Sequence, residues 1–361
     1  MKRMEAYVSI TRTLLAGALI ALIVPLAGAP AHAQSKGGPA VSDLATYAGA
    51  DRTQRLVEGA KKEGSVMVYT SMTVEDMAVL QAAFEKKHGI KIVVWRSSSE
   101  NIVRRAVAEA QAGRNEADIF ETNTPEMESL HREKVLHEVK SPHMAELIPQ
   151  AIPAHREWIG TRLNVFVMAY NTKLVKKEEL PRSYEDLVNP RWKGRLGIEA
   201  SDLDWFAGVV NDLGEAKGLK LFRDIVATNG LSVRKGHTLL TNLVISGEVP
   251  LALTVYQYKA EQLKNTGAPI DWLALPPIIA RFQGVGLSRR APHPHAALLF
   301  LDFLLTDAQE LLAKRDFTPS NRKISSPVHK MPFKLVDPKL VLDDNEKWSK
   351  LYSEIITRQA R

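Results

Sequence analysis

Short apolar runs alternate with longer amphipathic segments through the first third of the chain, and a polar loop follows each apolar run. The apolar runs lie at 65–69, 90–95 and 117–120, and the segments with apolar residues at helical spacing lie at 41–61, 74–88 and 101–113. A strand, a polar loop and a helix that repeat about every 30 residues predict a parallel sheet with connecting helices. The pattern therefore indicates an α/β fold.

The stretch 163–175, near the middle of the chain, starts as an almost continuous apolar run and breaks at Tyr170 and Asn171. A run of this kind predicts a strand that is covered on both faces, as in an α/β sheet. Similar strand and helix patterns lie before and after it. We therefore expect this stretch to cross from one lobe of the protein to another, with Tyr170 facing either the core or a bound solute.

The second half continues the alternation of strands and helices. Strands are predicted at 196–199, 250–255 and 270–275, and helices at 202–210, 218–228, 235–244, 259–265 and 296–305. The segment Gly284–Val285–Gly286 follows two prolines and is predicted to be a turn. The charged tail from Pro338 onward is predicted to be mostly helical.

The N-terminus has the pattern of a secretory signal peptide. Basic residues precede the apolar run 14–27, which ends at the small-residue site Ala31–His32–Ala33. We expect cleavage after Ala33 and export to the periplasm; the alternative is an uncleaved membrane anchor. The chain contains no cysteine, so a hydrophobic core without disulfides must stabilise the fold, and thiol chemistry is excluded.

Composition and motifs exclude several classes of function. The formal net charge of +7 is scattered, with no basic stripe interleaved with aromatic residues, which argues against nucleic-acid binding. The sequence also lacks the G-x-S-x-G, H-E-x-x-H, G-x-x-x-x-G-K-[ST] and G-x-G-x-x-G motifs. We therefore expect a binding protein rather than an enzyme, with a catalytic relative of the same fold as the alternative.

The loops after the first three predicted strands are rich in hydroxyl and amide groups. The carboxyl ends of parallel strands meet at one edge of a sheet, where helix N-termini can bind anions. Helix capping is the alternative explanation for serine and threonine at these positions. The candidate ligand-binding residues in these loops are Ser71, Arg96, Ser98, Ser99 and Asn123.

Several motifs, taken in order, resemble the periplasmic solute-binding proteins of ABC importers with type II topology, particularly the branch that binds ferric iron. They are VEGAKKEGSVMVYTS (57–71), AYNTKLV (169–175), SYEDLVNPRWKGRLGI (183–198), GEVPLALTVYQY (247–258) and APHPHAALLFLDFLLTDAQELLA (291–313). The resemblance implies two α/β lobes that close over a solute. Lobe 1 would comprise 41–169 and 276–335, lobe 2 would comprise 170–275, and a helical tail would occupy 336–361.

The resemblance also implies a possible ferric ligand, because ferric binders of this family offer adjacent tyrosines after the strand that here is 250–255. This chain has Tyr256 and Tyr258 separated by Gln257. Phenolate oxygens suit a hard trivalent cation. Glu121, after the third predicted strand, could add a carboxylate ligand or simply cap the next turn. The two tyrosines would share a face if the strand continued and would diverge if a helix began.

An oxyanion or a small organic acid, such as a phosphonate, a carboxylate or a phosphorylated compound, is the alternative ligand. Arg96 beside a serine-rich helix start suits an anion. Asp202 could hold an amine or cap a helix, and Thr238 opens a helix that could reach the cleft. Fe(III) would be a transported ligand rather than a cofactor, and we expect no cofactor. The expected partner is a membrane permease, and the protein is expected to be a monomer.

Overall fold

The computed structural model describes residues 41–358, which lie within one compact unit, Pro39–Arg361. The predicted signal peptide at 1–33 and its cleavage site lie outside the described residues. Among the residues described, no helix combines the length and the apolar character that crossing a membrane requires.

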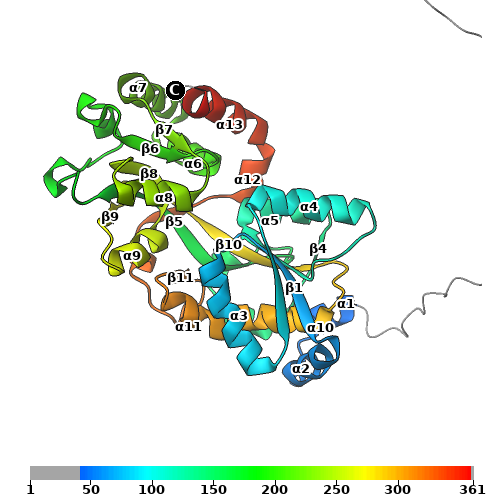
Figure 1. Ribbon diagram of the computed structural model, residues 1–361. Coiled ribbons are helices and arrows are strands. Elements are labelled where there is room, and N and C mark those ends of the chain that lie inside the picture. Colours follow the sequence, from blue (N-terminus) through cyan, green and yellow to red (C-terminus); the bar gives the residue numbers. More distant parts are fainter. Residues whose placement is uncertain (1–40, 359–361) are drawn as a thin grey trace, which may run out of the picture. The chain divides into compact units, whose positions relative to one another are not determined.

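The first part of the chain forms a parallel sheet with helices between its strands (Figure 1). Its elements are α1 (Val41–Thr46), α2 (Arg52–Glu63), β1 (Ser65–Thr70), α3 (Val74–His88), β2 (Lys91–Arg96), α4 (Ser99–Gln111), β3 (Ile119–Asn123), α5 (Thr124–Arg132), β4 (Leu136–His137), η1 (Pro142–Glu146) and η2 (Pro149–Ala151). As predicted, β1 pairs in parallel with both β2 and β3. The single helix predicted at 41–61 is wrong, because the chain breaks around Gly49, and glycine is a poor helix former.

The middle of the chain forms a second parallel group of strands, in the order β8-β6-β7. Its elements are β5 (Ile159–Asn171), η3 (Lys177–Glu179), η4 (Glu185–Val188), η5 (Pro190–Trp192), β6 (Leu196–Glu199), α6 (Leu203–Leu213), α7 (Glu215–Asn229), β7 (Ser232–Arg234), α8 (His237–Ser246), β8 (Leu251–Tyr256), α9 (Gln257–Asn265) and β9 (Ile270–Leu273). We call the β2-β1-β3 group with its helices the first lobe, and the β8-β6-β7 group with its helices the second lobe.

Two antiparallel strands, β5 and β10 (Ile278–Ser288), connect the lobes. β5 pairs with β10 as far as Val165 and with β8 from Phe166 onward, so it changes partner between these two residues. This change of partner lies upstream of Tyr170, where the sequence analysis placed the start of lobe 2. The lobe boundaries given in the sequence analysis remain predictions. Of the predicted crossover at 163–175, the part up to Asn171 belongs to one strand whose residues are all buried, whereas Thr172, Lys173 and Leu174 follow the strand and are exposed.

The predicted turn at 284–286 is wrong, because these residues belong to the buried strand β10. The glycines allow close packing there rather than a change of direction. A Cβ atom at Gly286 would lie 2.9 Å from the carbonyl oxygen of Glu157 and 2.7 Å from Cε of Met127. Strand β10 pairs with β3 on one side and with β5 on the other, which places it between the two lobes.

The last part of the chain returns to the first lobe and then crosses to the second. Its elements are α10 (Pro294–Leu305), α11 (Asp307–Ala313), β11 (Thr318–Pro319), η6 (Pro327–Lys330), β12 (Phe333–Leu335), α12 (Pro338–Asp343), α13 (Asn345–Tyr352) and the π-helical turn η7 (Ser353–Thr357). Every residue of α10 from Ala296 to Leu305 is buried, so this helix is the centre of the first core. Figure 1 shows α12 beside α5 and α13 beside α6.

Candidate functional site

A cavity of about 740 Å³ lies where the strand-end loops of both lobes meet. The first lobe contributes the loops after β1, β2 and β3, and the second contributes the loop after β6 and the starts of α8 and α9. Nine of the residues proposed from the sequence line it: Ser71, Arg96, Ser98, Ser99, Asn123, Asp202, Thr238, Tyr256 and Tyr258. Within residues 41–358, Tyr170 and Glu121 are not among its lining residues.

The serine-rich loop before α4 is not explained by helix capping alone. In the part of the chain that the structure describes, neither Ser98 before α4 nor Asn123 before α5 makes a side-chain capping bond. The Asn123 amide instead donates to the Ser99 hydroxyl at 2.9 Å. Arg96 is exposed and reaches the carbonyl oxygen of Met72 at 3.4 Å. These groups leave polar side chains directed at the cavity.

Glu121 has a structural partner, Arg162. Its carboxylate forms a buried ion pair with Arg162, with 2.8 Å between Oε1 and Nη1, and accepts a hydrogen bond from the Thr70 hydroxyl. Both side chains are at most 4% exposed. Glu121 therefore compensates the charge of Arg162, which does line the cavity.

Sequence reasoning missed four polar residues that the crossing strands bring to the cavity. They are Arg162 and Asn164 on β5 and Arg281 and Gln283 on β10. The Asn164 amide donates to Gln283 at 3.2 Å, and Gln283 donates to the Ser71 hydroxyl at 2.9 Å. A signal was present: polar residues two apart, in otherwise apolar strands, point to the same face.

Arg281 is the most constrained of these four residues. Its Nη1 lies 2.6 Å from Asp204 Oδ2, and its Nη2 donates to the Tyr256 hydroxyl. Among the described residues, the buried Nε atoms of Arg281 and Arg162 both lack a hydrogen-bond partner. An unpaired buried donor costs about 1–3 kcal/mol, so two of them beside one cavity indicate donors held ready for an acceptor.

Tyr256 and Tyr258 remain together although α9 begins between them, at Gln257. Their rings are stacked, with centroids 5.9 Å apart, and Tyr258 also stacks on Phe317 at 3.9 Å. Burial raises the pKa of both hydroxyls, and the opposing effect of nearby arginines does not cancel it. In this state both residues are neutral phenols.

Glu199, Asp202 and His237 form an acidic cluster on the second-lobe wall, with ligand-type atoms within 4.8 Å of one another. His237 Nε2 lies 3.2 Å from Asp202 Oδ1. Burial acts to lower the pKa of His237, but the Asp202 carboxylate outweighs it and raises that pKa above the ordinary value. Glu199 accepts from the backbone N–H of Gly236 at 2.8 Å, so it also holds the loop before α8. The cluster could hold a cation or an ammonium group.

Glu126, in the first turn of α5, is a further residue that the sequence reasoning missed. Its Oε2 atom is buried and lacks a hydrogen-bond partner within the described range 41–358. Burial raises the pKa of this carboxyl to about 7, against the opposing effect of Arg281. Glu126 is therefore mostly protonated below neutral pH and can then donate a hydrogen bond.

Raising the pH through 7 is expected to weaken the folded state through Glu126. The folded-state pKa of about 7 lies above the ordinary 4.5, so the stabilising contribution is complete below 4.5 and is lost as the pH passes 7. Between pH 5 and pH 9, the unfolding free energy of the parent should fall relative to that of Glu126→Gln by on the order of 3 kcal/mol. Urea denaturation at each pH measures this difference.

The exposed Glu133→Gln variant, at the residue that follows α5 directly, is the matched control for this experiment. Its unfolding free energy should change with pH as that of the parent does. A difference between the parent and Glu126→Gln that does not change with pH would contradict the raised pKa.

The comparison with protein families decides the family of the chain, because the bacterial extracellular solute-binding proteins match residues 69–311. The chain belongs to this family. The solute-binding family and role expected from the sequence motifs are thereby confirmed.

Relatives and solved structures of this solute-binding family agree with the fold. The Fe(3+)-binding periplasmic protein of Serratia marcescens is 26% identical over 267 residues, which cover 71% of this chain and 78% of that protein. Iron-bound HitA from Pseudomonas aeruginosa superimposes with a TM-score of 0.70 at 20% identity, covering 81% of this chain and 99% of that one. AfuA from Actinobacillus pleuropneumoniae, with fructose-6-phosphate bound, superimposes with a TM-score of 0.73 at 20% identity, covering 82% of this chain and 99% of AfuA. The two-lobed type II fold is confirmed.

Proposed function

We propose that this solute-binding protein captures an organic anion, such as a phosphate ester or a carboxylate, in the periplasm and delivers it to an ABC permease. The lobes would close on the solute about β5 and β10, and the closed form would dock on the permease. The observation that carries the anion assignment is the pair of arginines, Arg162 and Arg281, whose buried Nε donors stay unpaired beside the cavity.

The unpaired donors of the cavity wall, rather than its net charge, support an anion over a bare cation. Arg96 is exposed at the mouth, and no acidic side chain lies within ion-pair distance of it among the described residues. Arg162 and Arg281 are ion-paired with Glu121 and Asp204, so they offer a ligand hydrogen-bond donors rather than uncompensated charge. A phosphate or carboxylate could accept hydrogen bonds from these donors and from the hydroxyls of Ser71 and Ser98.

Ferric iron is a second candidate, and the stacked Tyr256 and Tyr258 favour it together with Glu199, Asp202 and His237. The name of the Serratia marcescens relative also points to iron. Binding through phenolate would require both tyrosines to lose their protons, against the raised pKa of each hydroxyl. It would also place a trivalent cation beside the guanidinium of Arg281.

A thermal-shift experiment on the mature protein tests the two candidates. The probes are fructose 6-phosphate, inorganic phosphate, citrate and ferric nitrilotriacetate, each at increasing concentration. An anion at about 100 times its Kd should stabilise the folded state by about 2.7 kcal/mol. Arg96→Gln should weaken anion binding about tenfold or more, because it removes a charged hydrogen-bond donor.

Arg223→Gln is the matched control, because Arg223 is exposed on α7 outside the cavity. It should bind each probe as the parent does. If no anion stabilises the protein and iron produces a visible charge-transfer band that Tyr258→Phe removes, the anion assignment is wrong and the iron assignment replaces it.

A further inference from the structure

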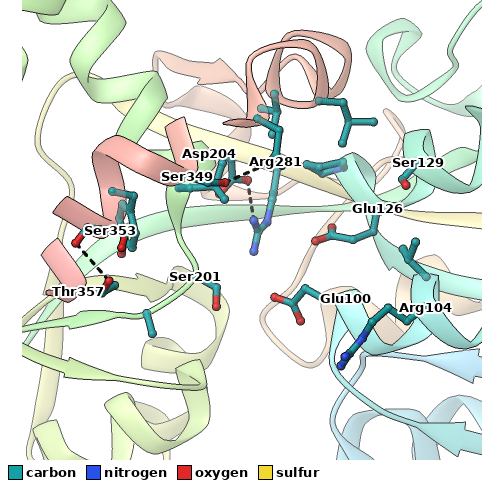
Figure 2. A pocket seen from close by; sticks show the side chains of 18 residues that line it. Glu100, Arg104, Glu126, Ser129, Ser201, Asp204, Arg281, Ser349, Ser353 and Thr357 are labelled. Carbon is teal, nitrogen blue, oxygen red and sulfur yellow. Dashed lines mark hydrogen bonds and ion pairs between the residues drawn. The ribbon is translucent and has the colours of Figure 1, made fainter. Parts of the chain in front are cut away.

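A second cavity, of about 520 Å³, lies beside the first and has walls from three parts of the chain. The first lobe contributes α4 and the start of α5, the second contributes the segment before and within α6, and the third wall is the C-terminal tail. Figure 2 shows Glu100 and Glu126 on one side, and Ser201 on the other side together with Ser349, Ser353 and Thr357 of the tail. We call this space the tail chamber.

The tail chamber adjoins the cavity described above, because both share lining residues. Glu126, Ser201 and Arg281 each line both spaces. In Figure 2 the Arg281 side chain extends into the middle of the view, between Ser201 and Glu126. A solute bound at Arg281 would therefore have room on two sides.

The far walls of the tail chamber are largely apolar. Val103 and Pro125 come from the first lobe, Leu203 from the second, and Val341 and Leu342 from α12. A volume of about 520 Å³ is in the range of sites that bind small organic molecules, and far exceeds the needs of one metal ion. The apolar part of the walls favours a hydrocarbon group.

Among the described residues, two polar groups at the boundary have no hydrogen-bond partner, and the exposed Glu100 also lines both spaces. The Nε of Arg281 and the Oε2 of Glu126 are both buried, and neither has a hydrogen-bond partner in the described part of the chain. Glu126 in its protonated form adds an O–H donor to the N–H donor of Arg281. An acid group that bridges the two spaces could accept hydrogen bonds from both donors.

We propose that the transported solute is an amphipathic organic anion: its acid group binds at Arg281 and Glu126, and its apolar part occupies the tail chamber. This inference rests on the proposed anion-binding function and narrows it to one class of solute. The C-terminal tail then forms part of the binding site, because Val341 and Leu342 of α12 line the tail chamber together with Val103 and Pro125.

Isothermal titration with matched probe pairs tests the proposal. Inorganic phosphate is compared with phenyl phosphate, and acetate with phenylacetate, so that the pairs also separate the two kinds of acid group. The phenyl-bearing member of at least one pair should bind about tenfold tighter or more, as expected for burial of a hydrocarbon ring. Equal affinity within both pairs would overturn the proposal and leave the anion-binding function standing.

Variants that fill the tail chamber add a second readout. Ser129→Phe and Ser349→Phe place a ring in the chamber from opposite walls, so that one serves if the other fails to fold. Each should remove the advantage of the phenyl-bearing probe and leave the affinity for the small anion unchanged. Ser42→Phe, on the exposed face of α1, is the control and should keep that advantage.

The outcomes distinguish failure of the apolar subsite from failure of the anion-binding function. Loss of the phenyl advantage in the chamber variants, and not in the control, supports the tail chamber as the apolar subsite. A phenyl advantage that persists in both chamber variants overturns it. If neither small nor phenyl-bearing anions bind the parent, the anion-binding function itself fails, and this proposal fails with it.

Discussion

Glu121→Ala is expected to destabilise the protein by about 3–5 kcal/mol, because it leaves the buried guanidinium of Arg162 without a counter-charge. Glu121 lies 2.8 Å from Arg162 and also accepts from Thr70. Arg162 cannot avoid the cost by losing its proton, since an arginine side chain stays charged in proteins. It also cannot reach solvent easily, because its side chain is 4% exposed and lies over the Phe317 ring.

Urea denaturation of the unliganded protein measures this loss, and Glu75→Ala is the matched control. Glu75 is another acidic residue of the first lobe that lines the cavity, but it is exposed. Its replacement should change stability by about 0.5 kcal/mol or less. A normal stability for Glu121→Ala, together with lost iron binding, would instead support the role of metal ligand that the sequence suggested for Glu121.

The strand-end loops of the site could be predicted because their placement follows from topology alone. Parallel strands bring Ser71, Arg96 and Asn123 to one edge whatever the details of packing, and the structure places all three on one cavity. The serine-rich sequence before α4 also indicated a polar site at this edge of the sheet. What the loops bind is not encoded in this arrangement, since the same edge suits many polar solutes.

The crossing strands were harder to predict, because their polar residues depend on which strands become neighbours. Arg281 meets Asp204 and Tyr256 only after β10 has paired between the two lobes, and these residues are far apart in the sequence. The glycines of β10 added to the difficulty. Gly286 suggests a turn by its local sequence, whereas the structure uses it to let Glu157 and Met127 approach the strand.

Local reasoning also left the geometry of the tyrosine pair open. The sequence could say only that a continuing strand would hold Tyr256 and Tyr258 on one face and that a helix would separate them. In the structure the strand ends at Tyr256 and a helix begins at Gln257, yet the rings of Tyr256 and Tyr258 still stack. Phe317, which follows α11, also stacks on Tyr258 and comes from a distant part of the chain.

Trp348→Ala is the second variant for which a large effect is expected, a loss of about 3–5 kcal/mol. The sequence predicted the C-terminal tail as a charged, mostly helical appendage, but Trp348 is 2% exposed and packs into the core of the second lobe. Its ring contacts Phe206 edge to face, as does the ring of Tyr352 one turn later. Alanine would leave a cavity between α13 and α6 that backbone movement could fill only in part.

Thermal and urea denaturation of the mature protein measure the effect, and Lys350→Ala is the control because Lys350 is exposed on the same helix. That variant should stay within about 0.5 kcal/mol of the unfolding free energy of the parent.

The tail also joins the first lobe, since Arg132 on α5 forms an ion pair with Asp343 on α12 at 2.7 Å. A tail that packs on both lobes must adjust when they move, so Trp348→Ala should also weaken binding of any solute that requires closure. Unchanged stability with Trp348→Ala would mean that the tail is only loosely attached to the second lobe.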